Sequence, residues 1–538
     1  MNTKIINPIL PGFYPDPSVC AAGGKFYLVN STFSYFPGLP VFESDDGMNW
    51  KQIGNIIDRE SQLDFSGAGV SRGLFAPTIR FYGGKFYCVC TQVDKIGNFI
   101  VSADRPEGPW SDPVEIRGAE GIDPSLFFDD DGTAWYIGTR PVPEGPKWNG
   151  NWEVWIQRID VKTGTLLGDS KGIWRGALKH CIWPEGPHIY KINGMYYLIH
   201  AEGGTGPDHA VCVARCASID GEWTGKPANP ILTHRHLGET AGVTCVGHAD
   251  LFCKGDGTWW MVCLASRPYG DGNSRCSNLG RETFIVPVKW ENGWPVVSWQ
   301  TGLVENVYNP DGSVAVSQNS ERAAALFPER DEFDSPEPEM YWLSLRGRHN
   351  VSLSERRGWL RMYGGNELCG NGDVSLFARR QASFSWRITA EMEPHLVRDG
   401  ESAGLVCFQS EKFNLRLAVT RRGGTDFVQV LRFCGSDRPE ILASVEIPAS
   451  EDRHFALEVI AERQNLSFLF STDGGKMNLL AENVDGSILS VEKAGGFVGT
   501  VLGMFAESPD GNPGRQMFAD FDGFAYYSDE VEWTDEQR

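Results

Sequence analysis

One stretch of this sequence decides how its fold is interpreted: Trp183-Pro184-Glu185-Gly186-Pro187-His188-Ile189-Tyr190. It opens a hydrophobic strand pattern that continues to Ile199. Because proline lacks a backbone donor and has a fixed φ, Glu185 is poorly placed inside a helix or a central strand. We expect it at the mouth of a strand, on a backbone that holds one carboxyl group still.

Two other acids stand in closely similar settings, Asp16 in Pro15-Asp16-Pro17 and Asp123 in Ile122-Asp123-Pro124. Each acid precedes an apolar run, a Gly or Asp-Gly turn and a second aromatic strand. Segments 75–87 and 246–260 share this layout without the acid. Repeats at intervals of roughly 45 to 65 residues match the scale of propeller blades. The sequence therefore predicts an all-β fold whose residues 1–322 form a five-bladed β-propeller catalytic domain.

The second half of the chain predicts a different β domain. A chain of 538 residues is too long for one ordinary core. Residues 327–338 are acidic and rich in proline, as in a linker. After them, the period-2 alternation of apolar residues predicts a C-terminal, concanavalin-like β-sandwich over residues 323–538.

Composition narrows the classes of partner. With 49 basic and 70 acidic residues, the formal charge of −21 disfavours nucleic acid and anionic membranes and is compatible with a neutral ligand. Neither an apolar leader nor a membrane-length apolar stretch is visible. The 13 cysteines are scattered without CxxC spacing, so we expect reduced thiols in a cytoplasmic protein and no zinc site.

The three acids predict a shared chemistry. Equivalent strand starts of a propeller converge at one axial end, so Asp16, Asp123 and Glu185 would meet there. Hydrolysis of a glycosidic bond needs one carboxylic acid to protonate the leaving oxygen and one carboxylate to activate water or attack carbon. A third carboxylate can raise the pKa of the acid and orient it. The alternative is that these acids cap turns or bind a metal.

The three acidic blocks resemble those of glycoside hydrolase family 43. Segments 185–194, 201–206 and 279–283 resemble its β-xylosidase branch. The resemblance implies a five-bladed propeller and an inverting hydrolase that requires no cofactor and acts on a small oligosaccharide. It also implies the roles of the acids: general base for Asp16, general acid for Glu185, and tuning and orientation of that acid for Asp123.

Other positions follow from the same resemblance. Arg281 matches an arginine that contacts the terminal sugar, with a structural salt bridge as the alternative. Phe33 matches an aromatic wall of that subsite, and Phe75 stands where the family usually has Trp, which leaves xylose or arabinose open. His248 resembles an axial histidine that contacts calcium or water in some relatives, and a core histidine is the alternative. The expected rim segment, residues 499–503, lacks the phenylalanine of the relatives, so no role is assigned to it.

Three functions compete. Retaining propeller hydrolases of fructosides would have an Asn-Asp-Pro block where this chain has Pro15-Asp16-Pro17. A non-catalytic carbohydrate-binding propeller would have lost at least one acid, and all three are present. We therefore expect an exo-1,4-β-xylosidase that releases terminal xylose from β-1,4-xylo-oligosaccharides, with α-L-arabinofuranosidase as a second or alternatively the main activity. A homo-oligomer is compatible with the sequence.

Overall fold

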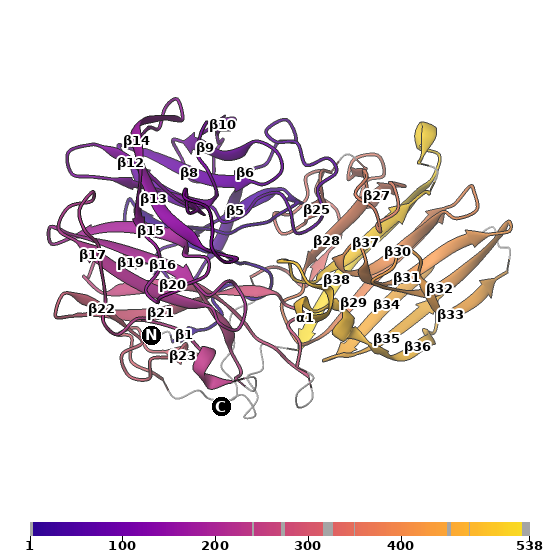
Figure 1. Ribbon diagram of the computed structural model, residues 1–538. Helices are drawn as coiled ribbons and strands as arrows, with labels where there is room; N and C mark the ends of the chain where they lie inside the picture. The colour runs from indigo at the N-terminus through magenta and orange to yellow at the C-terminus, as the bar shows by residue number, and fades with distance from the viewer. Residues whose placement is uncertain are drawn as a thin grey trace.

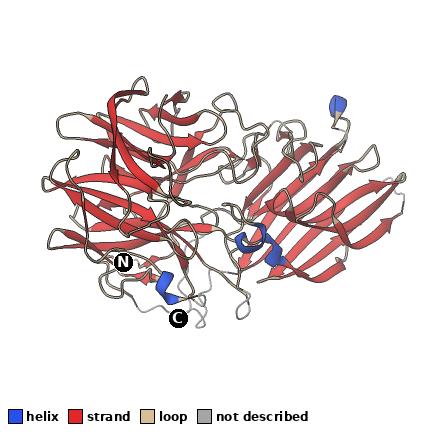
Figure 2. Ribbon diagram, viewed as in Figure 1, coloured by secondary structure: helices blue, strands red, loops and turns tan. Residues whose placement is uncertain are grey.

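The computed structural model describes residues 4–238, 241–270, 275–315, 326–348, 350–448, 453–472, 474–509 and 511–529. Strands dominate this part of the chain (Figure 2). Its helical segments are short: η1 (Arg235–Leu237), η3 (Gly486–Leu489), α1 (Val491–Ala494) and η4 (Pro513–Arg515). The predicted all-β class is thus confirmed. Within the described ranges, a helix with the length and apolar character needed to cross a membrane is not found.

Five four-stranded antiparallel sheets follow one another in the first half of the chain (Figure 1). Within each sheet the strands pair in chain order. The first three sheets contain β2 (Ser18–Ala22), β3 (Lys25–Val29), β5 (Gly38–Ser44) and β6 (Lys51–Ile57); β7 (Thr78–Tyr82), β8 (Lys85–Gln92), β9 (Gly97–Ala103) and β10 (Val114–Glu115); and β11 (Ile122–Phe128), β12 (Ala134–Pro141), β13 (Trp152–Asp160) and β14 (Thr165–Trp174). The other two contain β15 (Glu185–Ile192), β16 (Met195–Glu202), β17 (Ala210–Cys216) and β18 (Thr224–Gly225); and β19 (Thr244–Cys253), β20 (Trp259–Ser266), β21 (Arg281–Glu291) and β22 (Trp294–Val297).

The first strands of the five sheets form a closed ring. Strand β2 contacts β7, β7 contacts β11, β11 contacts β15, β15 contacts β19, and β19 returns to β2. Near the chain start, β1 (Ile5–Ile6) pairs with β23 (Val307–Tyr308), which ties the beginning of this region to its end. The predicted acidic blocks stand at the starts of three ring strands, so the ring brings them to one place.

A buried ion pair joins four of the five ring strands. Arg80 of β7 contacts Asp250 of β19 at 2.8 Å, and the Asp250 side chain is fully buried. Ser18 of β2 donates to the same carboxylate at 2.8 Å, and Tyr190 of β15 also donates to it. Burial alone would raise the pKa of Asp250, but Arg80, His188 and these donors hold it below its ordinary value.

The second half forms two stacked antiparallel sheets. The six-stranded sheet contains β28 (Ser375–Arg380), β37 (Val501–Glu507), β30 (Ser402–Ser410), β31 (Phe413–Arg422), β32 (Thr425–Cys434) and β33 (Glu440–Ile447). The eight-stranded sheet contains β26 (Val351–Ser352), β27 (Leu360–Tyr363), β38 (Phe518–Asp529), β29 (Ser385–His395), β34 (Phe455–Glu462), β35 (Asn465–Ser471), β36 (Asn478–Asp485) and β24 (Arg330–Asp331). Side chains of both sheets share one apolar core. Burial alternates along β29, as the period-2 pattern predicts for a sandwich strand.

The two halves are joined by backbone contacts. Strand β4 (Tyr35–Phe36) pairs with β25 (Ser344–Leu345). The Nε atom of Arg380 donates to the carbonyl of Phe13 at 2.6 Å. The predicted boundary between residues 322 and 323 falls within 316–325, outside the described residues. The segment that carries Asp16 is therefore held directly by the second half.

Candidate active site

One pocket contains all seven of the site residues that the sequence predicts. It is lined by all three acids, by four further predicted residues and by four residues that were not predicted: Asp16, Asp123, Glu185, Arg281, Phe33, Phe75, His248, Ala76, Ile122, Thr205 and Phe497. These side chains come from the starts of ring strands, from nearby loops and, for Phe497, from the second half of the chain. The pocket thus lies where the first strands converge.

The backbone at the acids has an uncommon conformation. Asp16 and Asp123 adopt left-handed φ values of 53° and 52°, which non-glycine residues rarely adopt. The pairing of β11 with β12 shifts register just after Ile122, and that of β15 with β16 shifts just after Glu185. Such bulges re-aim side chains at the ends of strands. Each strained residue costs about 1–3 kcal/mol, which the surrounding structure must offset.

Asp16 lies among groups that favour its charged form. Its carboxylate is 3.0 Å from Nη1 of Arg281 and accepts a 2.6 Å hydrogen bond from the hydroxyl of Ser31. The Nδ1 atom of His248 is 3.8 Å away. Burial alone would raise the pKa of Asp16, but Arg281, His248 and Ser31 together hold it below its ordinary value. Asp16 is therefore ionised near neutral pH.

Glu185 lies in the opposite electrostatic setting. Burial, followed by the charges of Asp123 and Asp16, raises the pKa of Glu185 well above its ordinary value. Burial also raises the pKa of Asp123 to about 6, although the backbone N–H of Gly186 donates to it at 3.1 Å. Two carboxyl groups whose pKa values are pushed apart are the expected signature of an acid and a base in one site.

Arg281 forms the ion pair that the sequence offered as the alternative to sugar binding, and it also lines the pocket. Its Nη1 donates to Thr205 at 3.0 Å, and its Nη2 donates to the carbonyl of Phe497 at 3.1 Å. The guanidinium is thus fixed by both halves of the chain. Arg281 lines the pocket, where a guanidinium N–H can donate to a ligand hydroxyl.

Three phenylalanines form one apolar wall. The ring centroids of Phe33 and Phe75 are 5.3 Å apart, and those of Phe33 and Phe497 are 5.9 Å apart in a stacked arrangement. Phe497 and Phe75 meet edge to face at 5.8 Å. Such pairs are favourable ring geometries. The predicted residues Phe33 and Phe75 therefore form a wall that a third ring completes.

Phe497 corrects the interpretation of the rim segment. Residues 499–503 contain no phenylalanine, whereas Phe497, two residues earlier, supplies the ring. Gly499 packs so closely that a Cβ there would lie 2.4 Å from the carbonyl oxygen of Leu279. The backbone N–H of Phe497 donates to the hydroxyl of Ser71 at 3.0 Å. The sequence thus located the rim segment correctly, and its phenylalanine lies just before the residues that were expected to carry it.

His248 lies beside Asp16 and offers one ring nitrogen to a calcium ion. Its ring packs so tightly on Gly186 that a Cβ there would lie 2.9 Å from it. Calcium takes six to eight oxygen ligands, whereas this imidazole offers one nitrogen beside an Asp16 carboxylate that Arg281 already holds. Among the described residues, the donor group that could hold a metal does not include His248. Calcium at this position stays a prediction.

Comparisons with known proteins agree with this geometry. Residues 5–295 match the family described as glycosyl hydrolases family 43, and residues 330–527 match the β-xylosidase C-terminal concanavalin A-like domain. A xylosidase/arabinosidase of Butyrivibrio fibrisolvens is 43% identical over 510 residues, which cover 93% of this chain and 95% of that protein. A non-reducing end α-L-arabinofuranosidase of Bacteroides ovatus is 35% identical over 531 residues, or 97% and 94% of the two chains.

Solved structures show the same likeness. The xylan β-1,4-xylosidase of Bacillus halodurans superposes with a TM-score of 0.86 and 31% identity, covering 97% of this chain and all of the other. The GH43B protein of a Bacteroides ovatus xyloglucan locus gives a TM-score of 0.86 and 33% identity over 98% of this chain and 100% of that one. With both parts of the chain matched, this protein belongs to glycosyl hydrolase family 43.

Proposed function

We propose that this glycoside hydrolase releases terminal xylose from β-1,4-xylo-oligosaccharides with inversion, and that it also hydrolyses α-L-arabinofuranosides. One observation carries the proposal: a single pocket holds an ionised carboxylate, Asp16, and a carboxyl group kept protonated, Glu185. The names of relatives that cover nearly the whole chain support xylosides and arabinofuranosides as substrates.

The residues divide the reaction between them. Asp16 accepts a proton from a water molecule as that water attacks the anomeric carbon. Glu185 gives its proton to the glycosidic oxygen, so the leaving sugar departs as a neutral alcohol. The Asp123 carboxyl group raises the pKa of Glu185 and accepts the Gly186 N–H, which fixes the backbone beside the acid. An inverting pair must leave room for the water, with carboxyl groups roughly 6.5–9.5 Å apart.

The apolar wall of the pocket supports cleavage at the ends of oligosaccharides. Phe33, Phe75 and Phe497 enclose an apolar face, and Arg281 offers donors beside it. A terminal sugar can stack its apolar face on a ring while its hydroxyls meet the arginine. Phe75 in place of a larger tryptophan leaves more room, which is the feature that favours accepting both pentoses.

We also assign the five four-stranded sheets as five blades of a propeller. The closed ring of first strands supports this assignment, as does the pairing of β1 with β23 at the closure point. The two stacked sheets of the second half then form the sandwich domain, with the domain boundary between β23 and β24. In this arrangement the starts of β2, β11 and β15 lie at one end of the ring axis.

Proton NMR of the first product tests the reaction directly. Hydrolysis of an aryl β-D-xyloside should release α-xylose before mutarotation, and the aryl α-L-arabinofuranoside should also be cleaved. Glu185→Gln serves as the control for background hydrolysis. Initial β-xylose, or transfer of the sugar to an added alcohol, would make Asp16 a nucleophile and overturn the inverting mechanism. Cleavage of neither glycoside would overturn the assigned substrates.

A further inference from the structure

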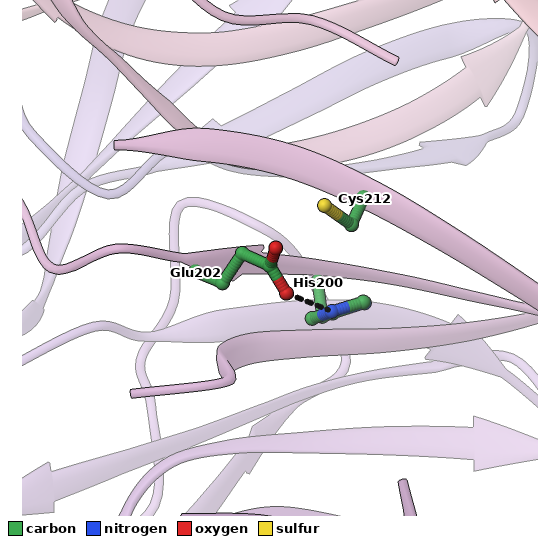
Figure 3. Close-up of side chains that lie close together, drawn as sticks. All are labelled: His200, Glu202 and Cys212. Carbon is green, nitrogen blue, oxygen red and sulfur yellow. Dashed lines mark ion pairs between the residues drawn. The ribbon is translucent and has the colours of Figure 1, made fainter. Parts of the chain in front are cut away.

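A group of buried metal-donor side chains lies on β16 and β17, in the sheet that begins with β15 (Figure 3). His200 and Glu202 are two residues apart on β16, so their side chains share one face of the sheet. Cys212 of β17 pairs directly with His200. Donor atoms of the three side chains lie within 4.8 Å of one another, and among the described residues no other group of three or more meets this condition.

A fourth donor approaches from the loop that leads to the candidate acid. Cys181 lies between β14 and β15, and its Sγ is 3.2 Å from Oε2 of Glu202. This side chain is only half-buried, whereas the other three are buried. Cys181 therefore lies on the side by which an ion could arrive from solvent.

The hydrogen bond of His200 shows which ring nitrogen carries the lone pair. The indole N–H of Trp174 donates to Nε2 of His200 at 3.1 Å, which makes Nε2 an acceptor, and an ion bound at Nε2 would take the place of this donor. Oε2 of Glu202, a second acceptor, lies 3.5 Å from that nitrogen (dashed line in Figure 3). A cation between two facing acceptors relieves their repulsion. A proton on Nε2 would instead leave the Trp174 N–H facing another donor.

Glu202 is a carboxyl group in a nearly dry place. It is 2% exposed, and it accepts hydrogen bonds from the backbone N–H of Ala177 and from the thiol of Cys181. Buried charges are paired or coordinate metals. Nδ1 of His200 is buried with no hydrogen-bond partner among the described residues, so the imidazole is not fully satisfied by the protein.

We propose that His200, Glu202, Cys212 and Cys181 form a binding site for one Zn²⁺ ion. One imidazole nitrogen, one carboxylate oxygen and two sulfurs are the ligand types and the number that zinc takes in a tetrahedral site. Bond lengths of about 2.0–2.3 Å place tetrahedral ligands roughly 3.3–3.8 Å apart, so the donors of His200, Glu202 and Cys212 need to close in only slightly. Cys181, which lies outside this group of three, must approach with its loop. Each thiol releases its proton to solvent as its sulfur–zinc bond forms.

The site is connected to the loop that positions Glu185. The backbone N–H of Ala177 donates to Oε2 of Glu202 at 2.9 Å, and Gly203 donates to the carbonyl of Ile182 at 3.0 Å. Zinc on Glu202 and Cys181 competes with the first contact and pulls the loop toward the sheet. We therefore expect bound zinc to change kcat, although none of its four ligands lines the pocket.

Binding is measured first on the full-length protein without substrate. Equilibrium dialysis with Zn²⁺ should give one ion per chain, and Co²⁺ should give the charge-transfer absorption of a cobalt–thiolate bond. Cys212→Ser should remove much of that band and weaken zinc binding by about tenfold or more. Absence of stoichiometric zinc, or a cobalt spectrum without thiolate bands, would overturn the proposal.

A matched control separates the site from general thiol chemistry. Cys216 lies on the same strand, is also buried, and donates to the carbonyl of Glu222. Cys216→Ser should bind zinc as the unaltered protein does, and equal losses in Cys212→Ser and Cys216→Ser would count against the site. His248→Ala should leave zinc binding unchanged. A loss of zinc binding in this variant would place the ion in the pocket instead.

If Cys212→Ser fails to fold, Cys181→Ser provides the test instead. The Cys181 side chain is half-buried on a loop, so we expect this variant to fold. This variant should lose part of the cobalt–thiolate absorption and should keep its activity when zinc is added. Undiminished thiolate absorption in Cys181→Ser would remove this residue from the site. Since binding is read without substrate, its failure is distinct from a failure of the proposed glycosidase function.

Discussion

Asp16 and Arg281 form an ion pair inside the pocket, and this pair sets the state of the candidate base. The sequence placed Arg281 by resemblance and expected it to contact sugar, with a salt bridge as the alternative. The 3.0 Å contact with Asp16 shows that the guanidinium also acts on the carboxylate. No local pattern could have shown this, because the two residues are 265 positions apart.

The first prediction concerns this pair. In Arg281→Ala the pKa of Asp16 should rise, because the arginine is the largest influence that lowers it against burial. A base with a raised pKa is protonated at higher pH, so the acidic limb of the kcat/KM profile should move to higher pH. We also expect kcat/KM at the optimum to fall by about tenfold or more, from lost sugar contacts.

The measurement is a pH series of kcat/KM on an aryl β-D-xyloside. Thr205→Ser keeps a hydroxyl beside the guanidinium and should leave the acidic limb in place. A profile that keeps its form in Arg281→Ala would mean that the arginine binds sugar without governing the ionisation of Asp16.

At the scale of elements, the starts of strands could be predicted from the sequence, whereas the packing of segments that are far apart in the sequence could not. Proline beside an acid and period-2 alternation are local signals, and they located the starts of β11 and β15 correctly. Phe497 was missed because its position depends on how a loop of the second half packs against Leu279. The His200 group was missed because strand pairing, rather than spacing along the chain, brings its donors together.

The second prediction tests the loop that carries Phe497. In Gly499→Ala the new Cβ would lie 2.4 Å from the carbonyl oxygen of Leu279, so the loop must move away. Displacing Phe497 by even an ångström loosens the wall, and such misplacement can reduce rates by up to about 100-fold. We expect KM for the aryl xyloside to rise and kcat/KM to fall by about tenfold.

Gly255→Ala is the control, because a Cβ there meets nothing within 4 Å. It should behave as the unaltered protein in both kinetic constants and in thermal stability. Unchanged kinetics in Gly499→Ala, in a protein that melts normally, would show that the close approach of this loop does not govern the pocket.

At the scale of the whole molecule, the ion pair of Arg80 and Asp250 ties the ring together. The carboxylate is reached by donors from β2, β7 and β15, whose sheets are far apart in sequence. In the sequence, Asp250 is only one residue of the repeated segment 246–260. Its role emerges from ring closure, which no single repeat reveals.

The third prediction is a loss of stability in Arg80→Met. This change leaves the Asp250 charge buried without its main partner, and breaking such a pair costs about 3–5 kcal/mol. The midpoint of urea unfolding should fall accordingly. Lys85→Met, which removes an exposed ion pair with Asp104 near the same sheet, should change nothing measurable. Equal midpoints for Arg80→Met and the unaltered protein would contradict the role given to this pair.

The pH dependence of this contribution has a definite sign. The folded pKa of Asp250 is below its ordinary value, so its stabilising effect is complete above the ordinary aspartate pKa of about 3.9. The effect is lost as the pH falls through the lower folded pKa. In Arg80→Met burial raises the pKa of Asp250 with less to oppose it, so the difference in stability between this variant and the unaltered protein should shrink as the pH falls toward the ordinary aspartate pKa and shrink further below it.

Phe497 also sets an order of events during synthesis. The ribosome makes the acids early, at positions 16, 123 and 185, but the third ring of the wall is residue 497 of 538. N-terminal domains generally fold while the rest of the chain is still being made. Once β23 (Val307–Tyr308) has been made and the ring can close, a nascent chain carries all three carboxyl groups in an open pocket until Phe497 follows. A product of termination between these two points would have the acids and lack the closed wall.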